Sequence, residues 1–280
     1  MLHLLLDSAI SYSLAKIGNY CTSFCYLCKN CTQKSKKTHK PKTYKFMQME
    51  RLLQLTADGS HTLYIPEMDE HYHSVNGAIQ ESEHIFIGAG LRAMEKPDIR
   101  ILEIGFGTGL NALLTWKEAE QSGQFRHITY HTIERYPLSE EITARLNYGE
   151  RVWPERKELF DALHRAEWNQ PVDLSERFTL HKIEGDSNTC PLPESIDLIY
   201  MDAFAPEKQP EMWNEAFYHK LYTHADEGAI LVTYCAKGEV RRAMQSAGFR
   251  MERLPGPPGK RHILRGRKSQ APVISGSFKA

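Results

Sequence analysis

The chain has 280 residues, of which 41% are hydrophobic and 25% are charged, and its formal net charge is zero, which fits one α/β domain with additions. No stretch approaches the roughly 20 apolar residues of a membrane span, and polar residues interrupt the segment 2–17 too often for a secretory signal. Four of the six cysteines lie within residues 21–31, which is no disulfide framework, so a cytoplasmic protein without membrane contact is predicted.

Residues 1–46 differ in composition from the rest of the chain. They carry eight Lys or Arg residues against one acid, which predicts a basic, disordered extension. A cysteine cluster in this segment has, at its first three positions, the spacing of the radical-SAM iron–sulfur loop, and thiolates so spaced could hold a cluster or zinc. The cluster consists of Cys21, Cys25, Cys28 and Cys31. No β/α-barrel pattern follows, so we expect no metal; an accidental leader before a natural start at Met47 or Met49 is the alternative.

Residues 47–98 are expected to form a hairpin and a helix that cover a ligand site. The dipeptide Asp58-Gly59 separates two alternating runs, which favours a β-hairpin. Tyr72 lies between two histidines, but no third ligand has a suitable spacing, so we expect a covering loop rather than a metal site. Apolar residues at helical spacing predict a helix over Ala78–Met94.

Strands and helices alternate over residues 99–268, and residues 269–280 form a tail. The alternation predicts an α/β fold with a mostly parallel sheet and helices on both faces. Strands are expected at Ile99–Ile104, His127–Glu134, Phe178–Glu184, Ile196–Asp202 and Ala229–Tyr234, and a C-terminal antiparallel pair at Phe249–Leu254 and Arg261–Arg267. Helices are expected at Leu110–Gln121, Ser139–Tyr148, Pro154–Trp168, Met212–His224 and Glu239–Ala247.

A glycine-rich turn joins the first of these strands to the first helix. Gly105, Gly107 and Gly109 alternate with other residues, and Glu103 stands two positions before the first glycine. Glycines at this place let a nucleotide-like ligand approach bare backbone at a helix N-terminus. The turn differs from the dinucleotide pattern G-x-G-x-x-G and resembles the first motif of the S-adenosyl-L-methionine (SAM)-dependent methyltransferases. The resemblance implies a Rossmann-like class I methyltransferase fold with SAM as the methyl donor.

Acids stand at the ends of four successive strands, where parallel sheets bind ligands. Glu134 lies 25 residues after Gly109, where a carboxylate would accept both ribose hydroxyls; a salt bridge with Arg135 is the alternative. Asp186 is placed to accept from the adenine amine or to cap a turn. Glu103 would bind the methionine ammonium or order the glycine turn, and Tyr72 would cover the methionine end.

The most distinctive segment begins where the fourth strand ends. Asp202 is followed by Phe204 and a proline-stiffened loop. Methyl transfer from SAM needs a neutral amine, and a primary amine is mostly protonated at neutral pH. Asp202 is therefore our candidate for accepting the proton or orienting the amine, with Phe204 shaping a slot for a base. The alternative for Asp202 is a helix N-cap or a loop-ordering role.

At this point a second, closer resemblance appears, which covers Leu52–Arg267. The segments that carry it are Asp202-Ala-Phe-Ala-Pro-x-Lys-x-Pro-x-Met-Trp213, Gly105-Phe-Gly-Thr-Gly-Leu-Asn111, Gly77-Ala-Ile-Gln-Glu-Ser-Glu83 and Gly259-Lys260-Arg261. They resemble the methyltransferase module of the MnmC/MnmD family, which completes the methylaminomethyl group on the wobble uridine of tRNA. The resemblance implies that Asp202 is catalytic and that the SAM site includes Gly105, Gly107, Thr108, Gly109, Asn111, Glu134 and Asp186. Bifunctional relatives fuse an FAD-dependent oxidase after this module; only a short tail follows here, so we expect no FAD.

The charge distribution is consistent with a tRNA partner. Residues 236–280 carry eleven Lys or Arg residues against two acids, although solvated basic tails would give the same count. We expect Lys260 and Arg261 to contact the anticodon stem-loop. The predicted activity is conversion of 5-aminomethyl(-2-thio)uridine to the 5-methylaminomethyl form without a metal. Alternatives are a polyamine-type methyl- or aminopropyltransferase and a non-catalytic SAM- or RNA-binding protein, and the sequence leaves the oligomeric state open.

Overall fold

The computed structural model describes residues 49–269. The expectations for residues 1–46, including the four clustered cysteines, and for the residues after Ser269 lie outside the described part.

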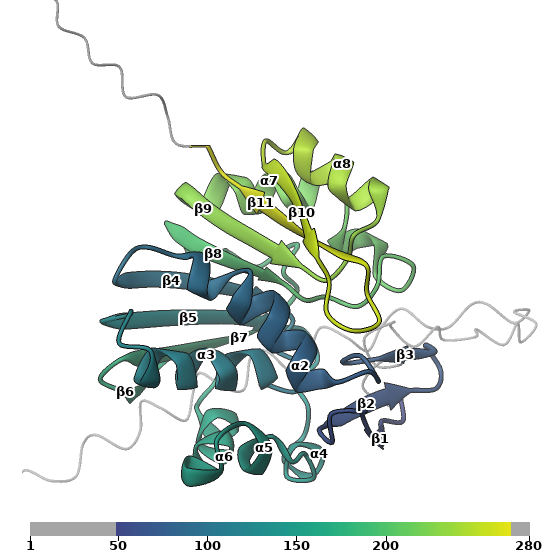
Figure 1. Cartoon of the computed structure of the whole chain (residues 1–280), viewed down its shortest axis with the longest axis vertical. Coiled ribbons are helices and arrows are strands. Elements are labelled where there is room, and N and C mark those ends of the chain that lie inside the picture. The colour runs from purple at the N-terminus through teal and green to yellow at the C-terminus, as the bar shows by residue number, and fades with distance from the viewer. Residues whose placement is uncertain (1–48, 270–280) are drawn as a thin grey trace, which may run out of the picture. The chain divides into compact units, whose positions relative to one another are not determined.

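An eight-stranded sheet forms the centre of the described part (Figure 1). Its order is β10-β11-β9-β8-β4-β5-β7-β6, and the five strands from β9 to β7 pair in parallel. The C-terminal pair and the edge strand β6 are antiparallel, as is the contact between β11 and β9. The strands span Asp98–Ile104 (β4), His127–Glu134 (β5), Pro171–Ser175 (β6), Phe178–Glu184 (β7), Ile196–Met201 (β8), Ala225–Thr233 (β9), Arg250–Pro255 (β10) and His262–Arg267 (β11). The predicted α/β class, the mostly parallel sheet and the antiparallel C-terminal pair are confirmed.

Helices cover both faces of the sheet, because successive strand residues point to opposite sides. In β4, Ile101 packs into one hydrophobic cluster and Leu102 into another. The first cluster includes residues of α3, α5 and α6, and the second includes residues of α7 and α8. These helices span Leu110–Gln121 (α3), Tyr148–Val152 (α5), Glu158–Arg165 (α6), Glu215–His224 (α7) and Gly238–Ser246 (α8). All six residues of β8 are buried, as expected for a central strand with helices on both faces.

A separate three-stranded sheet precedes the domain core, and it contains the predicted hairpin. Strands β1 (Leu52–Leu55) and β2 (His61–Ile65) pair antiparallel around Asp58-Gly59, and the short strand β3 (Glu70–His71) follows. Asp58 also accepts a hydrogen bond of 3.0 Å from the backbone of Gln80. The hairpin turn therefore anchors the beginning of helix α2, Ala78–Ser82.

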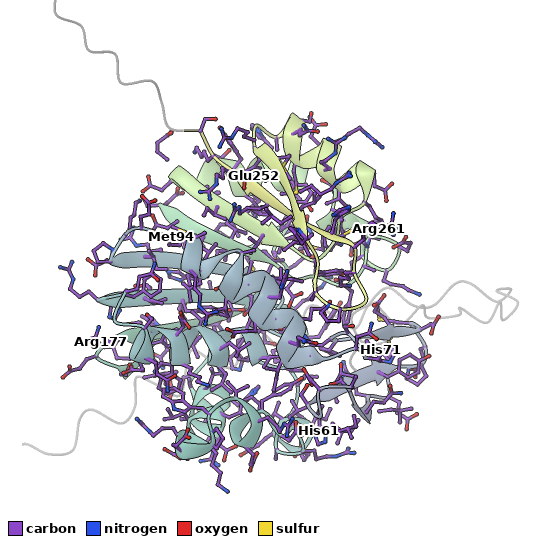
Figure 2. All side chains as sticks on the ribbon, in the orientation of Figure 1. His61, His71, Met94, Arg177, Glu252 and Arg261 are labelled. Atoms are coloured by element: carbon purple, nitrogen blue, oxygen red, sulfur yellow. The ribbon has the colours of Figure 1, made fainter. Side chains whose placement is uncertain are left out.

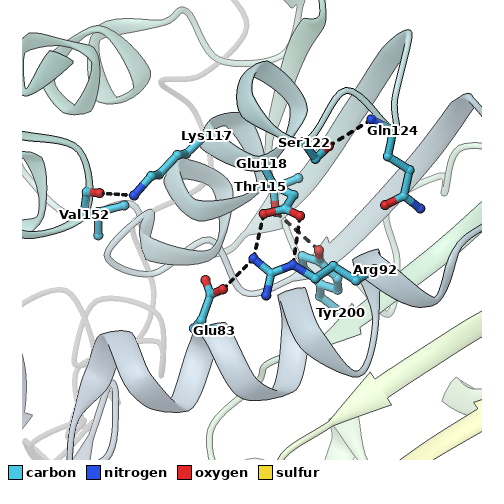
Figure 3. A network of polar contacts seen from close by, with 9 residues as sticks. All are labelled: Glu83, Arg92, Thr115, Lys117, Glu118, Ser122, Gln124, Val152 and Tyr200. Atoms are coloured by element: carbon cyan, nitrogen blue, oxygen red, sulfur yellow. Dashed lines mark hydrogen bonds and ion pairs between the residues drawn. The ribbon is translucent and has the colours of Figure 1, made fainter. Parts of the chain in front are cut away.

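The prediction of one continuous helix over Ala78–Met94 is wrong. The segment consists of α2, a π-helical turn at Glu83–Gly88 and a 3₁₀ turn at Leu91–Ala93. A Cβ at Gly90 would lie 2.5 Å from the carbonyl oxygen of Phe86, so the backbone folds back more tightly than a helix with side chains allows. Arg92 fixes the folded-back segment by pairing with Glu83 and with Glu118 of α3 (Figure 3).

Three other predicted helices are shorter in the structure, and one strand of the eight-stranded sheet, like the short strand β3, was not predicted. In the region Ser139–Tyr148, helix α4 spans only Glu140–Thr143, and the last residue begins helix α5. Prolines begin 3₁₀ turns at Pro154–Arg156 and Pro210–Met212, so α6 and α7 start later than predicted. Proline favours such first turns because it lacks the N–H that a helix interior needs. Strand β6 begins with Pro171, which the edge of the sheet tolerates.

Candidate active site

A cavity of about 320 Å³ opens at the carboxyl ends of the parallel strands. This is the edge at which open α/β sheets bind ligands, and the volume lies in the range of small-molecule sites. Of the residues that the sequence predicted for the site, those that line the cavity are Tyr72, Gly105, Gly107, Thr108, Glu134, Asp186, Asp202, Phe204 and Lys260. Glu103, Gly109, Asn111 and Arg261 lie outside the lining.

The glycine turn needs its glycines for both conformation and space. Gly105, Gly107 and Gly109 have φ angles of 93°, 50° and 75°, which disfavour any side chain. A Cβ at Gly105 would lie 2.9 Å from the carbonyl oxygen of Asp202, and one at Gly107 would lie 3.2 Å from the Tyr72 ring. The turn thus packs directly against the Asp202 loop on one side and under Tyr72 on the other.

Two histidines, the buried His73 and the half-buried His164, hold Thr108 in the middle of this turn. His73 Nε2 lies 2.6 Å from the Thr108 hydroxyl, and His164 Nε2 lies 3.1 Å from the Thr108 carbonyl oxygen. Burial lowers the pKa of each histidine to about 4, so both are neutral near pH 7. The turn is therefore fixed by hydrogen bonds to two uncharged rings, of which His73 lines the cavity and His164 does not.

Glu134 and Asp186 both line the cavity and both already make protein contacts. Glu134 accepts hydrogen bonds from the backbone N–H groups of Gly107 (3.0 Å) and Tyr136 (2.8 Å), and burial raises its pKa. Arg135 pairs with Asp186 at 2.9 Å rather than with Glu134. Asp186 also accepts from the backbone of Asn188 in a tight turn, which is the alternative role that the sequence left open.

Asn111 connects two carboxyl groups that the sequence assigned to different tasks. Its Nδ2 donates to Glu103 Oε1 at 3.0 Å and to Asp202 Oδ2 at 2.8 Å. Glu103 is 1% exposed and also accepts from the hydroxyl of Thr132 at 2.8 Å, so it lies behind the cavity wall. Burial, with a smaller contribution from the charge of Asp202, raises the pKa of Glu103 to about 8. Glu103 thus orders Asn111, which in turn orients Asp202.

Asp202 is the titratable group best suited to proton transfer in this cavity. Burial raises its pKa to about 7; the Asn111 hydrogen bond and Lys260 lower it, while the charge of Glu81 raises it. The N-cap of helix α7 is Asn214, which accepts from the backbone of Phe217 at 2.9 Å. Asp202 is therefore not a helix cap, and its carboxylate faces the cavity.

Aromatic side chains and a fixed loop surround Asp202. Phe204 meets Tyr72 edge to face, with ring centres 5.0 Å apart. The backbone of Phe204 is held on both sides, by the indole N–H of Trp213 at 2.7 Å and by the side chain of Gln209 at 2.9 Å. The loop therefore presents the Phe204 ring at a defined position beside the catalytic candidate.

Glu81 is a residue that sequence reasoning placed in a family motif without giving it a role. It lines the cavity, accepts a hydrogen bond of 3.0 Å from the backbone of Ser74, and pairs with Lys260 at 3.2 Å. The contact joins residues 179 positions apart in the chain. No local pattern signals such a pair. Only the position of Glu81 in a helix that covers the strand ends could have suggested a role for this residue in the site.

Known proteins resemble this chain over most of its length. Residues 154–269 match the family model of an S-adenosyl-L-methionine-dependent methyltransferase. The chain is 33% identical over 229 residues to the tRNA 5-methylaminomethyl-2-thiouridine biosynthesis bifunctional protein MnmC of Cupriavidus metallidurans, an alignment that covers 75% of this chain and 32% of MnmC. The MnmC of Leptospira interrogans is 32% identical over 217 residues, 73% of this chain and 33% of its own length. The chain is a homologue of one region of MnmC. It spans about a third of the length of these relatives.

A solved structure agrees with this assignment at the level of the fold. MnmC2 from Aquifex aeolicus superposes with a TM-score of 0.63 at 24% identity, covering 84% of this chain and 79% of that protein. The expected class I methyltransferase fold is therefore confirmed, and the family description supports SAM as the methyl donor.

Within residues 49–269, no group of three or more His, Cys, Asp or Glu side chains could hold a metal ion. None of the helices in that range is long and apolar enough to cross a lipid bilayer.

Proposed function

We propose that this chain is a cytoplasmic SAM-dependent N-methyltransferase that converts 5-aminomethyl(-2-thio)uridine at the tRNA wobble position to its 5-methylaminomethyl form. The observation that carries the proposal is Asp202: a carboxyl with a pKa of about 7, oriented by Asn111 and facing a cavity beside the glycine turn, in a homologue of MnmC.

The residues of the cavity fit a nucleoside-containing methyl donor. Gly105 and Gly107 line the cavity, so the backbone of the glycine turn borders the space that a ligand would fill. Each carboxylate oxygen of Glu134 accepts one backbone hydrogen bond and keeps a lone pair for a ribose hydroxyl. Asp186 is our candidate for the adenine amine and Tyr72 for the cover of the methionine end. SAM supplies an electrophilic methyl group when bound.

The residues of the Asp202 loop prepare the acceptor. A primary ammonium must lose one proton before its nitrogen can act as a nucleophile. A carboxyl whose pKa lies near 7 can take that proton at neutral pH and release it to solvent afterwards. Phe204 would stack on the base that carries the amine, which must leave its own helical stack to reach the cavity.

The surface near the cavity offers charges for RNA. Arg242, Arg253 and Arg261 are exposed, and within residues 49–269 they make no ion pair. Arg265 and Arg267 instead pair with Glu252, which makes them unsuited to a phosphate contact. We therefore propose that the anticodon stem-loop approaches over the loop between β10 and β11, which holds Lys260 and Arg261. Figure 2 shows Arg261 on the same side of the molecule as His71, a residue of the cavity wall.

A small-amine transferase is the second candidate, favoured by the acidic character of the cavity. Apart from histidines, the cavity lining has two basic side chains, Arg135 and Lys260. It has six acidic side chains, which are Glu70, Glu81, Glu134, Asp186, Asp202 and Glu211. Incubation with methyl-labelled SAM and either aminomethyl-bearing tRNA or spermidine distinguishes the two. We expect label in tRNA alone; label in spermidine alone would replace the proposal, and label in neither would indicate a binding protein. Mass analysis of tRNA nucleosides from cells lacking the protein should show 5-aminomethyl(-2-thio)uridine accumulating.

A further inference from the structure

The cavity already contains a primary ammonium group, supplied by the protein itself. Lys260 enters from the loop between β10 and β11, and its Nζ lies 3.2 Å from Glu81 Oε1. The same Nζ lies 4.9 Å from the centre of the Tyr234 ring, within the range of a cation–π contact. A carboxylate and an aromatic face therefore hold an alkylammonium in the cavity that also contains Asp202.

Glu81 is positioned by contacts that do not involve Lys260. The backbone N–H of Ser74 donates to Glu81 Oε2 at 3.0 Å, and the neighbouring Gln80 is tied to Asp58. Oε1 is buried and, among residues 49–269, accepts no hydrogen bond; its ion-pair partner there is Lys260. A buried carboxylate oxygen that accepts no hydrogen bond favours binding of a cationic group that can donate one.

Tyr234 ties this pair to the Asp202 loop. Its hydroxyl donates to the carbonyl oxygen of Ala203 at 2.9 Å, so the ring keeps its position relative to the adjacent Asp202. The charges of Glu81 and Lys260 shift the pKa of Asp202 in opposite directions, which places both groups within electrostatic reach of its carboxyl. The held ammonium and the candidate proton acceptor thus belong to one connected arrangement.

We propose that Glu81 and Tyr234 form an ammonium-binding subsite for the primary amine of the substrate, and that Lys260 occupies this subsite while substrate is absent. The inference rests on the proposed function. An aminomethyl group on a pyrimidine ends in the same CH₂–NH₃⁺ unit as a lysine side chain, so the contacts that hold Lys260 serve the substrate equally. The arriving amine replaces Lys260 in this subsite.

Two anticodon stem-loop RNAs that differ only in the aminomethyl group of the wobble uridine provide the test. Their dissociation constants are measured by fluorescence anisotropy without SAM. The ratio of the two constants (plain RNA over aminomethyl RNA) gives the contribution of the amine to binding. Phosphate contacts contribute equally to both constants and cancel. Methyl transfer to the aminomethyl RNA is measured in parallel with wild-type protein.

In the Lys260→Met protein, where no internal ammonium competes, a further Glu81→Gln substitution should lower this ratio about 10- to 100-fold, the value of one charge-assisted hydrogen bond. SAM affinity should not change. Tyr234→Leu should lower the ratio by a smaller factor, because it removes only the cation–π contact. Lys260→Met should raise the ratio about 3- to 10-fold if Lys260 fills the subsite about 70–90% of the time. Lys237→Met is the matched control: Lys237 pairs with Glu207, and neither residue lines the cavity, so the ratio should stay at the wild-type value.

Each other outcome has a definite meaning. An unchanged ratio in both Glu81→Gln and Tyr234→Leu would overturn the subsite, as would a lower ratio in Lys260→Met. Loss of SAM affinity in a Glu81→Gln protein with the wild-type melting temperature would overturn it too, because Glu81 would then serve the donor. Wild-type protein that methylates the aminomethyl RNA with a ratio near 1 refutes this inference alone. Wild-type protein that does not methylate that RNA refutes the proposed function.

Discussion

The pH dependence of methyl transfer should report the ionisation of Asp202. A carboxyl with a pKa of about 7 is roughly 9% ionised at pH 6 and 91% at pH 8, so kcat/KM should rise about 10-fold over this range. A carboxyl at the ordinary value of 3.8 would be fully ionised throughout and would give no such rise. The measurement is single-turnover methyl transfer from labelled SAM to aminomethyl RNA between pH 5.5 and 8.5.

The amine of the substrate also titrates, and the substitution Asp202→Asn distinguishes its ionisation from that of the Asp202 carboxyl. The introduced amide would keep the shape and the contact with Asn111 but could not accept a proton, so kcat/KM at pH 8 should fall about 10²- to 10⁴-fold. SAM affinity should remain, since the glycine turn is unchanged. A wild-type profile that is flat between pH 6 and 8, or an Asp202→Asn profile with the wild-type rise, would refute the reasoning.

Four further outcomes are expected. Gly105→Ala should lower SAM affinity, measured by calorimetry, at least 10-fold, because its Cβ would lie 2.9 Å from a carbonyl oxygen at a φ of 93°; unchanged affinity would show that the turn adapts. Glu103→Gln should raise the melting temperature at pH 8 relative to wild type: the folded pKa of about 8 lies above the ordinary 4.5, so Glu103 stabilises the fold when protonated and loses that contribution as pH rises through 8; equal melting curves at pH 8 would contradict this. Arg261→Ala should weaken binding of both RNAs alike and reduce the salt dependence by about one phosphate contact; a change in the ratio between the RNAs would give Arg261 another role. Deletion of residues 1–46 should leave methyl transfer intact, and an inactive truncation in a protein of wild-type melting temperature would assign that segment a part in catalysis.

The parts of the fold that follow from local patterns could be predicted from the sequence. Helix α3 and strands β5 and β7 have the predicted bounds, because apolar periodicity and the glycine turn mark them. The acids at the strand ends were found by the same reasoning, since the carboxyl ends of parallel strands share one edge. Glu134, Asp186 and Asp202 accordingly line one cavity.

What the sequence could not reveal depends on contacts between distant segments. The break in the helix expected over Ala78–Met94 arises where Gly90 packs against the Phe86 carbonyl, which helical periodicity does not register. Glu103 was expected near the cofactor, yet its side chain lies behind the wall, because residue parity in β4 depends on the register with its neighbours. The pairing of Glu81 with Lys260 needs the folded chain, as nothing in either local sequence refers to the other.

Because His73 and His164 hold Thr108 by hydrogen bonds, the glycine turn and the Asp202 carboxyl respond differently to a change of pH. Both rings stay uncharged until the medium approaches pH 4, whereas the Asp202 carboxyl changes its charge near neutrality. Mild acidification therefore protonates Asp202 while the two histidines that hold the glycine turn keep their charge state. Under the proposed function, a fall of about one pH unit from neutrality would slow methyl transfer by protonating Asp202, and the loss of that single proton would restore it.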